Sequence, residues 1–159
     1  MTFGDLVSGL LSQYLKSRKK AVTAFISFSL FFVLIYLLFM RGASNTTMYF
    51  IISMMGFGNG FWTVFVTISA ENFGTNLRAT VATTVPNFSR GSLVPITGIF
   101  TTLTPAHFSP TTSALILTVL IYGLCYLSLW KIEETFGKDL DFLEIQTSSA
   151  SKKKITKTE

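Results

Sequence analysis

Charged residues are scarce in this sequence, and they are scarcest in its middle. Only 13% of the 159 residues are charged, whereas a soluble globular domain carries about a quarter. Between residues 21 and 130 the charged side chains are Arg41, Glu71, Arg78 and Arg90. Because a soluble fold needs far more polar side chains on its surface, this scarcity predicts an integral membrane protein.

Cysteine and histidine are almost absent, which excludes several kinds of site. The single cysteine, Cys125, and the single histidine, His107, leave no pair for an intrachain disulfide and no cluster for a Cys- or His-based metal site. The sequence also has no Ser-His-Asp set, no paired catalytic carboxylates and no phosphate-binding glycine loop. We therefore expect no cofactor, no metal and no enzymatic activity.

Long apolar runs fill most of the chain. A helix that crosses the bilayer core needs about 20 apolar residues. Four stretches meet this length: 21–40, 48–70, 81–103 and 110–130. The third also contains Arg90, Pro86 and Pro95. The opening stretch, 3–15, is too short to span and contains Asp5, so it resembles half of a helix and suggests that the chain is a fragment. The predicted fold is all-α and polytopic, with a half-helix followed by four transmembrane helices.

The basic residues predict the orientation of these helices. Eleven of them lie in the loop after the half-helix, in the loop before residue 81 and in the C-terminal tail: Lys16, Arg18, Lys19, Lys20, Arg78, Lys131, Lys138, Lys152, Lys153, Lys154 and Lys157. The loops on the other side contain only Arg41. By the positive-inside rule, the basic loops and the C-terminus are cytoplasmic, and we expect a multi-pass protein of the plasma (inner) membrane.

The same positions explain the isoelectric point near 9.5. The Lys and Arg residues flank apolar runs and form no basic face of the kind that binds nucleic acid, so the predicted partner is the lipid bilayer. Residues 147–159 are rich in Ser, Thr and Lys and are predicted to be a disordered cytoplasmic tail. Its lysines either bind anionic lipid headgroups or are simply solvated.

Three short patterns occur in order along residues 1–146. The first is GLLSQYLKSRKK, residues 9–20, a glycine followed by a basic cluster, with Gln13 at the position of a usual acidic residue. The second is ENFGTNLRAT, residues 71–80, followed by PNFSRG with Asn87 and Arg90. The third is EETFGKDLDFLE, residues 133–144. Together these patterns resemble the major facilitator superfamily of transporters, and within it the sugar-porter-like branch.

The resemblance implies the end of the eighth helix through the twelfth helix of a twelve-helix secondary transporter. Such proteins bind a solute near the membrane midplane, between two halves that rock against each other. The implied substrate is a small polar solute, a sugar or a small carboxylate, with or without coupled protons, and the implied partner is the missing N-terminal half. The isolated chain is then expected to be inactive. The alternative is a stand-alone small membrane protein with a partner-binding or structural role and no transport.

Residues at the cytoplasmic ends of the helices, most of them charged, form a predicted gating network. Its members are Gly9, Gln13, Arg18, Lys19, Glu71, Arg78 and Glu134. Within it, Glu71 and Arg78 are the predicted latch, an ion pair that closes in one conformational state and opens in the other. The alternative is that they are solvated loop charges whose pairing contributes about 0–1 kcal/mol.

Two charged residues are predicted to lie near the membrane midplane. At a rise of about 1.5 Å per residue, Arg90 is about 15 Å from Thr80, and Asp5 is about 16 Å from Lys16. Charges at this depth usually face protein or water and have a partner. We predict that Asp5 and Arg90 pair or share a water-filled cavity, where they handle protons or anions. The alternative is that Arg90 bonds backbone carbonyls freed by the two prolines.

The segment GFGNGFW, residues 56–62, is the candidate solute-binding stretch. Asn59 and Trp62 are three residues apart, so on a continuous helix they share a face and offer a hydrogen bond and an aromatic wall to a ligand. Gly56 and Gly60 are predicted to permit close helix approach. In the alternative interpretation the glycines serve packing only and Trp62 contacts lipid.

Overall fold

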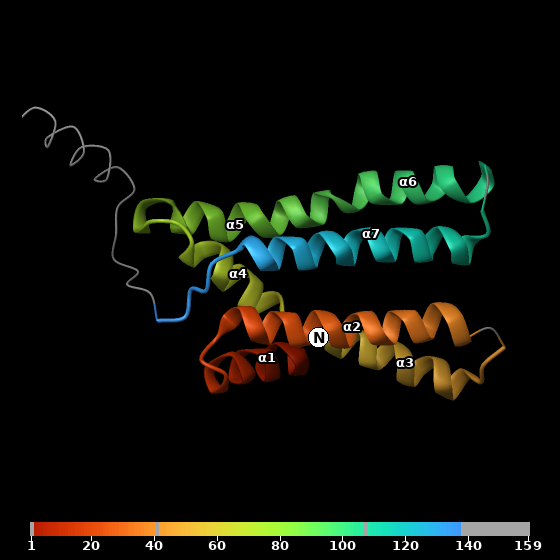
Figure 1. Cartoon of the computed structure of the whole chain (residues 1–159), viewed down its shortest axis with the longest axis horizontal. Helices are drawn as coiled ribbons and strands as arrows, with labels where there is room; N and C mark the ends of the chain where they lie inside the picture. The colour runs from red at the N-terminus through yellow and green to blue at the C-terminus, as the bar shows by residue number, and fades with distance from the viewer. Residues whose placement is uncertain (1, 41, 107, 138–159) are drawn as a thin grey trace, which may run out of the picture.

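The computed structural model describes residues 2–40, 42–106 and 108–137, and these residues are helical with short connections (Figure 1). The helices of the described ranges are α1 (Thr2–Tyr14), α2 (Arg18–Phe39), α3 (Asn45–Gly58), α4 (Trp62–Glu71), α5 (Thr75–Gly91), α6 (Leu93–Ala106) and α7 (Pro110–Lys131). This confirms the all-α prediction. The predicted tail, 147–159, lies outside the described residues.

Serine caps explain where three of the helices begin. Ser17, Ser44 and Ser109 precede α2, α3 and α7, and the hydroxyl oxygen of each accepts a hydrogen bond from a backbone N–H in the first turn. Such a cap satisfies one of the N–H groups that a helix start leaves without a partner. Because Ser17 caps α2, this helix begins at Arg18, before its uncharged segment.

Within the described part of the chain, three helical segments are long and apolar enough to cross a membrane: Arg18–Phe39, Asn45–Glu71 and Pro110–Lys131. They correspond to three of the four predicted spans and indicate a membrane protein. The second segment consists of α3 and α4, which are separated by a turn at residues 59–61. The short helix predicted at residues 3–15 is present as α1.

The fourth predicted span, 81–103, was wrong as one uninterrupted helix. It is divided at Ser92 into α5 and α6, which lie end to end in Figure 1. Pro95 stands in the first turn of α6 and has no N–H to donate to the carbonyl of Gly91, so the helical hydrogen-bond ladder is broken there. Pro86 removes a second donor within α5.

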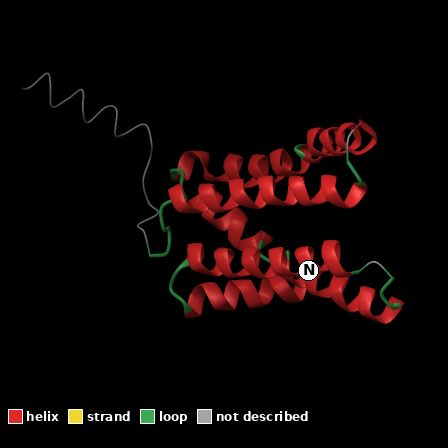
Figure 2. Ribbon diagram, turned by 45° about the vertical axis from the view of Figure 1, so that its right-hand side comes forward, coloured by secondary structure: helices red, strands yellow, loops and turns green. Residues whose placement is uncertain are grey.

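Two groups of helices make up the bundle (Figures 1 and 2). One group contains α1, α2 and α3, and the other contains α5, α6 and α7. The short helix α4 passes between the groups and packs on both α1 and α5, while α2 also packs against α7. The interrupted segment α3–α4 therefore connects the two groups.

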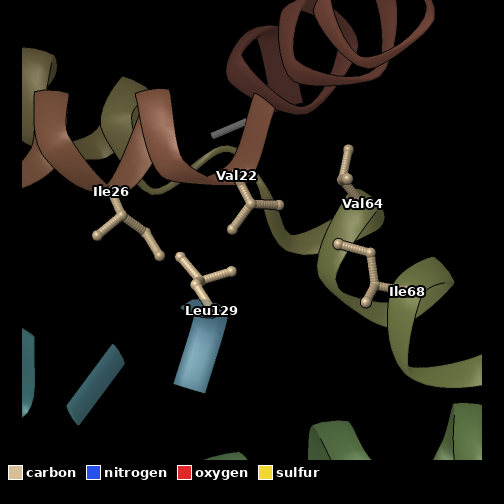
Figure 3. Packing of buried hydrophobic residues seen from close by; sticks show 5 residues of the cluster. All are labelled: Val22, Ile26, Val64, Ile68 and Leu129. Carbon is tan, nitrogen blue, oxygen red and sulfur yellow. The ribbon is translucent and has the colours of Figure 1, made fainter. Parts of the chain in front are cut away.

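The buried apolar core is small and lies where α2, α4 and α7 meet. It consists of Val22, Ile26, Val64, Ile68 and Leu129 (Figure 3). By contrast, large apolar side chains are exposed along the outside of α1, α3 and α7, among them Phe3, Tyr49, Phe50, Val119 and Leu124. Exposed apolar surface on this scale marks a surface that contacts other protein or lipid.

Candidate functional site

The interruption between α3 and α4 is the centre of the candidate site. Asn59 ends α3, and its backbone N–H donates to the carbonyl of Met55, while the N–H of Gly60 donates to Phe57. Helix α4 then starts at Trp62 without a side-chain cap from Phe61. The chain thus presents, inside a long apolar segment, the N-terminus of a half-helix that its own preceding residue does not cap.

A contact between two glycines holds α1 against this interruption. A Cβ atom on Gly60 would overlap the backbone of Gly4, and one on Gly4 would lie 2.5 Å from the carbonyl oxygen of Phe57. The sequence predicted close approach at Gly60, and the structure places it there. At Gly56, however, no neighbouring atom lies within reach of an added Cβ among the described residues, so this glycine does not mediate a close contact.

The docked α1 brings Asp5 to the start of α4. Its Oδ1 accepts a hydrogen bond from the backbone N–H of Thr63 at 3.4 Å. This N–H is one of those that a helix start leaves without an intrahelical partner. A carboxylate is favoured at this position because the helix dipole is positive at the N-terminus. Asp5 therefore caps a helix to which it does not belong.

Arg90 reaches the same turn from α5. Its guanidinium carbon lies 5.5 Å from the centroid of the Trp62 ring, a cation–π contact. In the described ranges Asp5 and Arg90 form no ion pair with each other, and Arg90 donates no hydrogen bond to a backbone carbonyl. Asp5 and Arg90, the two charges that the sequence predicts near the membrane midplane, contact neighbouring residues, Thr63 and Trp62, at the first turn of α4.

In the structure Asn59 hydrogen-bonds to another helix, whereas the sequence predicts that it faces a ligand together with Trp62. Because the helix is interrupted between Asn59 and Trp62, the spacing of three residues does not place them on one continuous helix face. The Oδ1 of Asn59 accepts a hydrogen bond from Ser29 at 3.5 Å, and the Ser29 Oγ lies 2.9 Å from the hydroxyl of Tyr122. Ser29 is 1% exposed. This polar chain links α2, the end of α3 and α7.

Sequence reasoning missed Ser29 and Tyr122. A serine in the middle of an otherwise apolar span was the available signal, because hydroxyl side chains commonly hydrogen-bond between membrane helices. Tyr122, its partner on α7, had no comparable signal in the sequence, because the pairing depends on how α2 and α7 pack against each other in space.

Charged residues form a second cluster at the ends of α2, α4 and α7. The Nη2 of Arg18 lies 2.7 Å from the Oε1 of Glu71, whose side chain is only 7% exposed. The sequence predicted that Glu71 pairs with Arg78 across the intervening loop. Among the described residues, the structure shows an ion pair of Glu71 with Arg18, because α2 packs against α4.

Glu134 joins the segment after α7 to the start of α2. Its carboxylate accepts hydrogen bonds from the backbone N–H groups of Arg18 and Lys19, at 2.9 and 3.3 Å, and from the hydroxyl of Ser17. In addition, the Nζ of Lys19 donates to the carbonyls of Trp130 and Ile132 at 3.0 and 2.9 Å. The carboxylate is thus a cap for α2 supplied from the other end of the chain.

These contacts determine the charge state of Glu134. Partial burial raises the pKa of the carboxyl group, but the hydrogen bonds from Ser17 and from the backbone of Phe136, Arg18 and Lys19 outweigh it, and the net result is a pKa below the usual value. Glu134 therefore stays ionised at neutral pH and holds the N-terminus of α2.

Two of the remaining predicted network residues, Gly9 and Gln13, lie outside this cluster. Gly9 has open space around it, and the exposed side chain of Gln13 makes no hydrogen bond with any part of the chain that the structure describes. Arg78 lies in the first turn of α5.

A groove of about 310 Å³ lies between α6 and α7. Its lining includes Phe100, Leu117 and Tyr122. The hydroxyls of Thr97 and Thr118 in this lining donate to carbonyls of their own helices. The groove therefore presents an apolar surface.

No group of three or more His, Cys, Asp or Glu side chains that could hold a metal ion occurs within residues 2–40, 42–106 and 108–137. Comparison of the chain with protein-family models, with curated proteins and with solved structures gives no match.

Proposed function

We propose that this chain is the C-terminal part of a facilitator-type secondary transporter that moves a small polar solute by alternating access. The observation that carries the proposal is the interruption of the α3–α4 segment, where Asp5, Trp62 and Arg90 meet. Secondary transporters commonly build their solute sites from interrupted helices near the midplane.

The physical cost of this arrangement supports the proposal. Irregular backbone at membrane depth is tolerated only where it is buried in protein or lines a water-filled cavity. Charged side chains there are expensive and generally mark a solute or ion pathway. A purely structural bundle would be more stable without the interruption, Asp5 and Arg90.

The cluster at the other end supplies the gate in this proposal. Arg18, Glu71 and Glu134 connect α2, α4 and the segment after α7, so a movement of these helices relative to one another would have to open the contacts. A latch of this kind shifts the balance between two conformations by its own interaction energy. The sequence patterns that resemble the sugar-porter-like branch include these residues. The proposal places them on the cytoplasmic side of the plasma membrane, with or without proton coupling.

The size of the native product is the first test. An antibody raised against residues 139–159 should detect a polypeptide more than twice 17.6 kDa in native membranes, because the proposal requires an N-terminal half. A single band near 17.6 kDa would contradict the proposal and favour a stand-alone membrane protein. The exposed apolar residues Phe3, Leu6 and Leu10 of α1 would then be a surface for a protein partner.

The site is tested on the native-size protein in vesicles. Uptake of labelled hexoses and small carboxylates should fall in the Asp5→Asn and Arg90→Gln variants and should change its dependence on pH. Lys131→Gln, which removes an exposed charge at the end of α7, serves as the control. Wild-type uptake and an unchanged pH profile in both site variants would exclude a role for these residues.

A further inference from the structure

Helix α5 carries a polar face that no other helix covers. Asn76, Thr80, Thr83, Asn87 and Arg90 are all exposed, and they follow one another at alternating spacings of four and three residues. This spacing places them along one side of the helix. None of the residues of α5 is buried. Since hydrocarbon does not solvate such a surface, this face of α5 is suited to contact with water, a polar ligand or another protein segment.

The donors at the end of this face form no hydrogen bond or ion pair with the residues that the structure describes. Among the described residues, the Arg90 guanidinium contacts only the ring of Trp62 and forms neither an ion pair nor a hydrogen bond. The amide of Asn87, one turn earlier, makes no hydrogen bond within the same ranges. The nearby carboxylate of Asp5 accepts a hydrogen bond from Thr63 and does not neutralise Arg90.

We propose that Arg90 and Asn87 bind the carboxylate of a small organic anion, with Trp62 as the wall for its carbon skeleton. This proposal rests on the proposed function and names the class of its substrate. A guanidinium matches a carboxylate with two parallel hydrogen bonds, and an aromatic wall beside a few polar groups is typical of small-molecule sites. An uncharged solute would leave the cation at this depth uncompensated, which is costly.

The test measures binding separately from transport. Labelled lactate and succinate, with glucose as the uncharged comparison, are titrated onto the native-size protein in lipid nanodiscs. We expect at least one carboxylate to bind and glucose not to compete with it. Loss of a hydrogen-bonded charge pair should weaken this binding about 10- to 100-fold in Arg90→Gln. Arg90→Lys should retain more of the binding, and Lys131→Gln should match the wild type.

Each result decides one of the two proposals. Absence of carboxylate binding, or wild-type affinity in Arg90→Gln, overturns the anion site, and glucose uptake by the same preparation would then leave the transporter proposal intact. Carboxylate binding that depends on Arg90, without uptake of any solute into vesicles, supports the anion site and overturns transport. Because Arg90→Lys preserves the charge, it also separates loss of binding from loss of folding.

Discussion

Two carboxylates in this protein cap helices to which they do not belong. Asp5 of α1 accepts from the start of α4, and Glu134, beyond α7, accepts from the start of α2. Each one satisfies N–H groups that a helix start leaves unpaired and interacts favourably with the helix dipole. At the scale of single residues, these caps are how segments far apart in the sequence are held together.

Glu134 can be tested through the pH dependence of stability. Replacing it in Glu134→Gln should lower the free energy of unfolding by about 0.5–2 kcal/mol, the usual effect of losing an N-terminal cap. The pKa of the Glu134 carboxyl group is lower in the folded protein than in the unfolded chain. The stabilisation is therefore fully present at pH values above the ordinary glutamate pKa of about 4.3, and it is lost as the pH falls through the lower pKa of the folded protein. Thermal unfolding in detergent should therefore show wild type and variant converging in acid.

The control for this measurement is Lys131→Gln, which changes the charge without removing a cap. A difference between wild type and Glu134→Gln that stayed constant from neutral to strongly acidic pH would contradict the assigned role of the carboxylate.

At the scale of helices, the protein is organised around interruptions. The break between α3 and α4 receives α1 through the contact of Gly4 with Gly60, and the break at Ser92 separates α5 from α6. The first break has a glycine because no side chain fits there. The second follows from the missing N–H of Pro95.

The glycine contact is tested by a matched pair of substitutions. Gly60→Ala should lower the free energy of unfolding by about 1–3 kcal/mol or more, the usual cost of overpacking, because the new methyl group would overlap the backbone of Gly4. Gly56→Ala, in the same segment but with open space around it, should be neutral or stabilising, since alanine favours a helix over glycine by about 0.5–1 kcal/mol. Thermal unfolding of the two variants in detergent measures the difference, and equal effects would argue against the α1 docking contact.

At the scale of the whole molecule, the ion pair of Arg18 with buried Glu71 links α2 and α4. Arg18→Glu should destabilise the protein by about 3 kcal/mol or more, because it leaves a buried carboxylate without its partner. The double variant Arg18→Glu with Glu71→Arg should recover part of this loss, as judged by thermal unfolding. The double variant Arg78→Glu with Glu71→Arg tests the pairing expected from the sequence. Recovery of stability in this double variant, without recovery in the double variant at Arg18 and Glu71, would contradict the structure.

The whole-molecule proposal also predicts what the chain does by itself. Vesicles that contain only these 159 residues should take up labelled solutes no faster than empty vesicles, because alternating access requires two halves around the site. Measurable uptake above that of empty vesicles would contradict the proposal that a second half is needed.

The sequence by itself determined the membrane class, the all-helical fold and three of the spans. These properties are sums over neighbouring residues: hydropathy accumulates along a segment, and a serine cap acts within one turn. The same local logic identified Asp5 and Arg90 as unusual, since a charge within a long apolar stretch is conspicuous wherever the helix lies.

Only the tertiary structure decided which residues meet. It paired Glu71 with Arg18, placed Asp5 at the start of α4, and joined Asn59 to Ser29 and Tyr122. It also divided the stretch 81–103 at Ser92. Partners on different helices depend on the packing of whole elements in space, and this packing rests on a contact as specific as that between Gly4 and Gly60, which hydropathy and spacing along the chain do not encode.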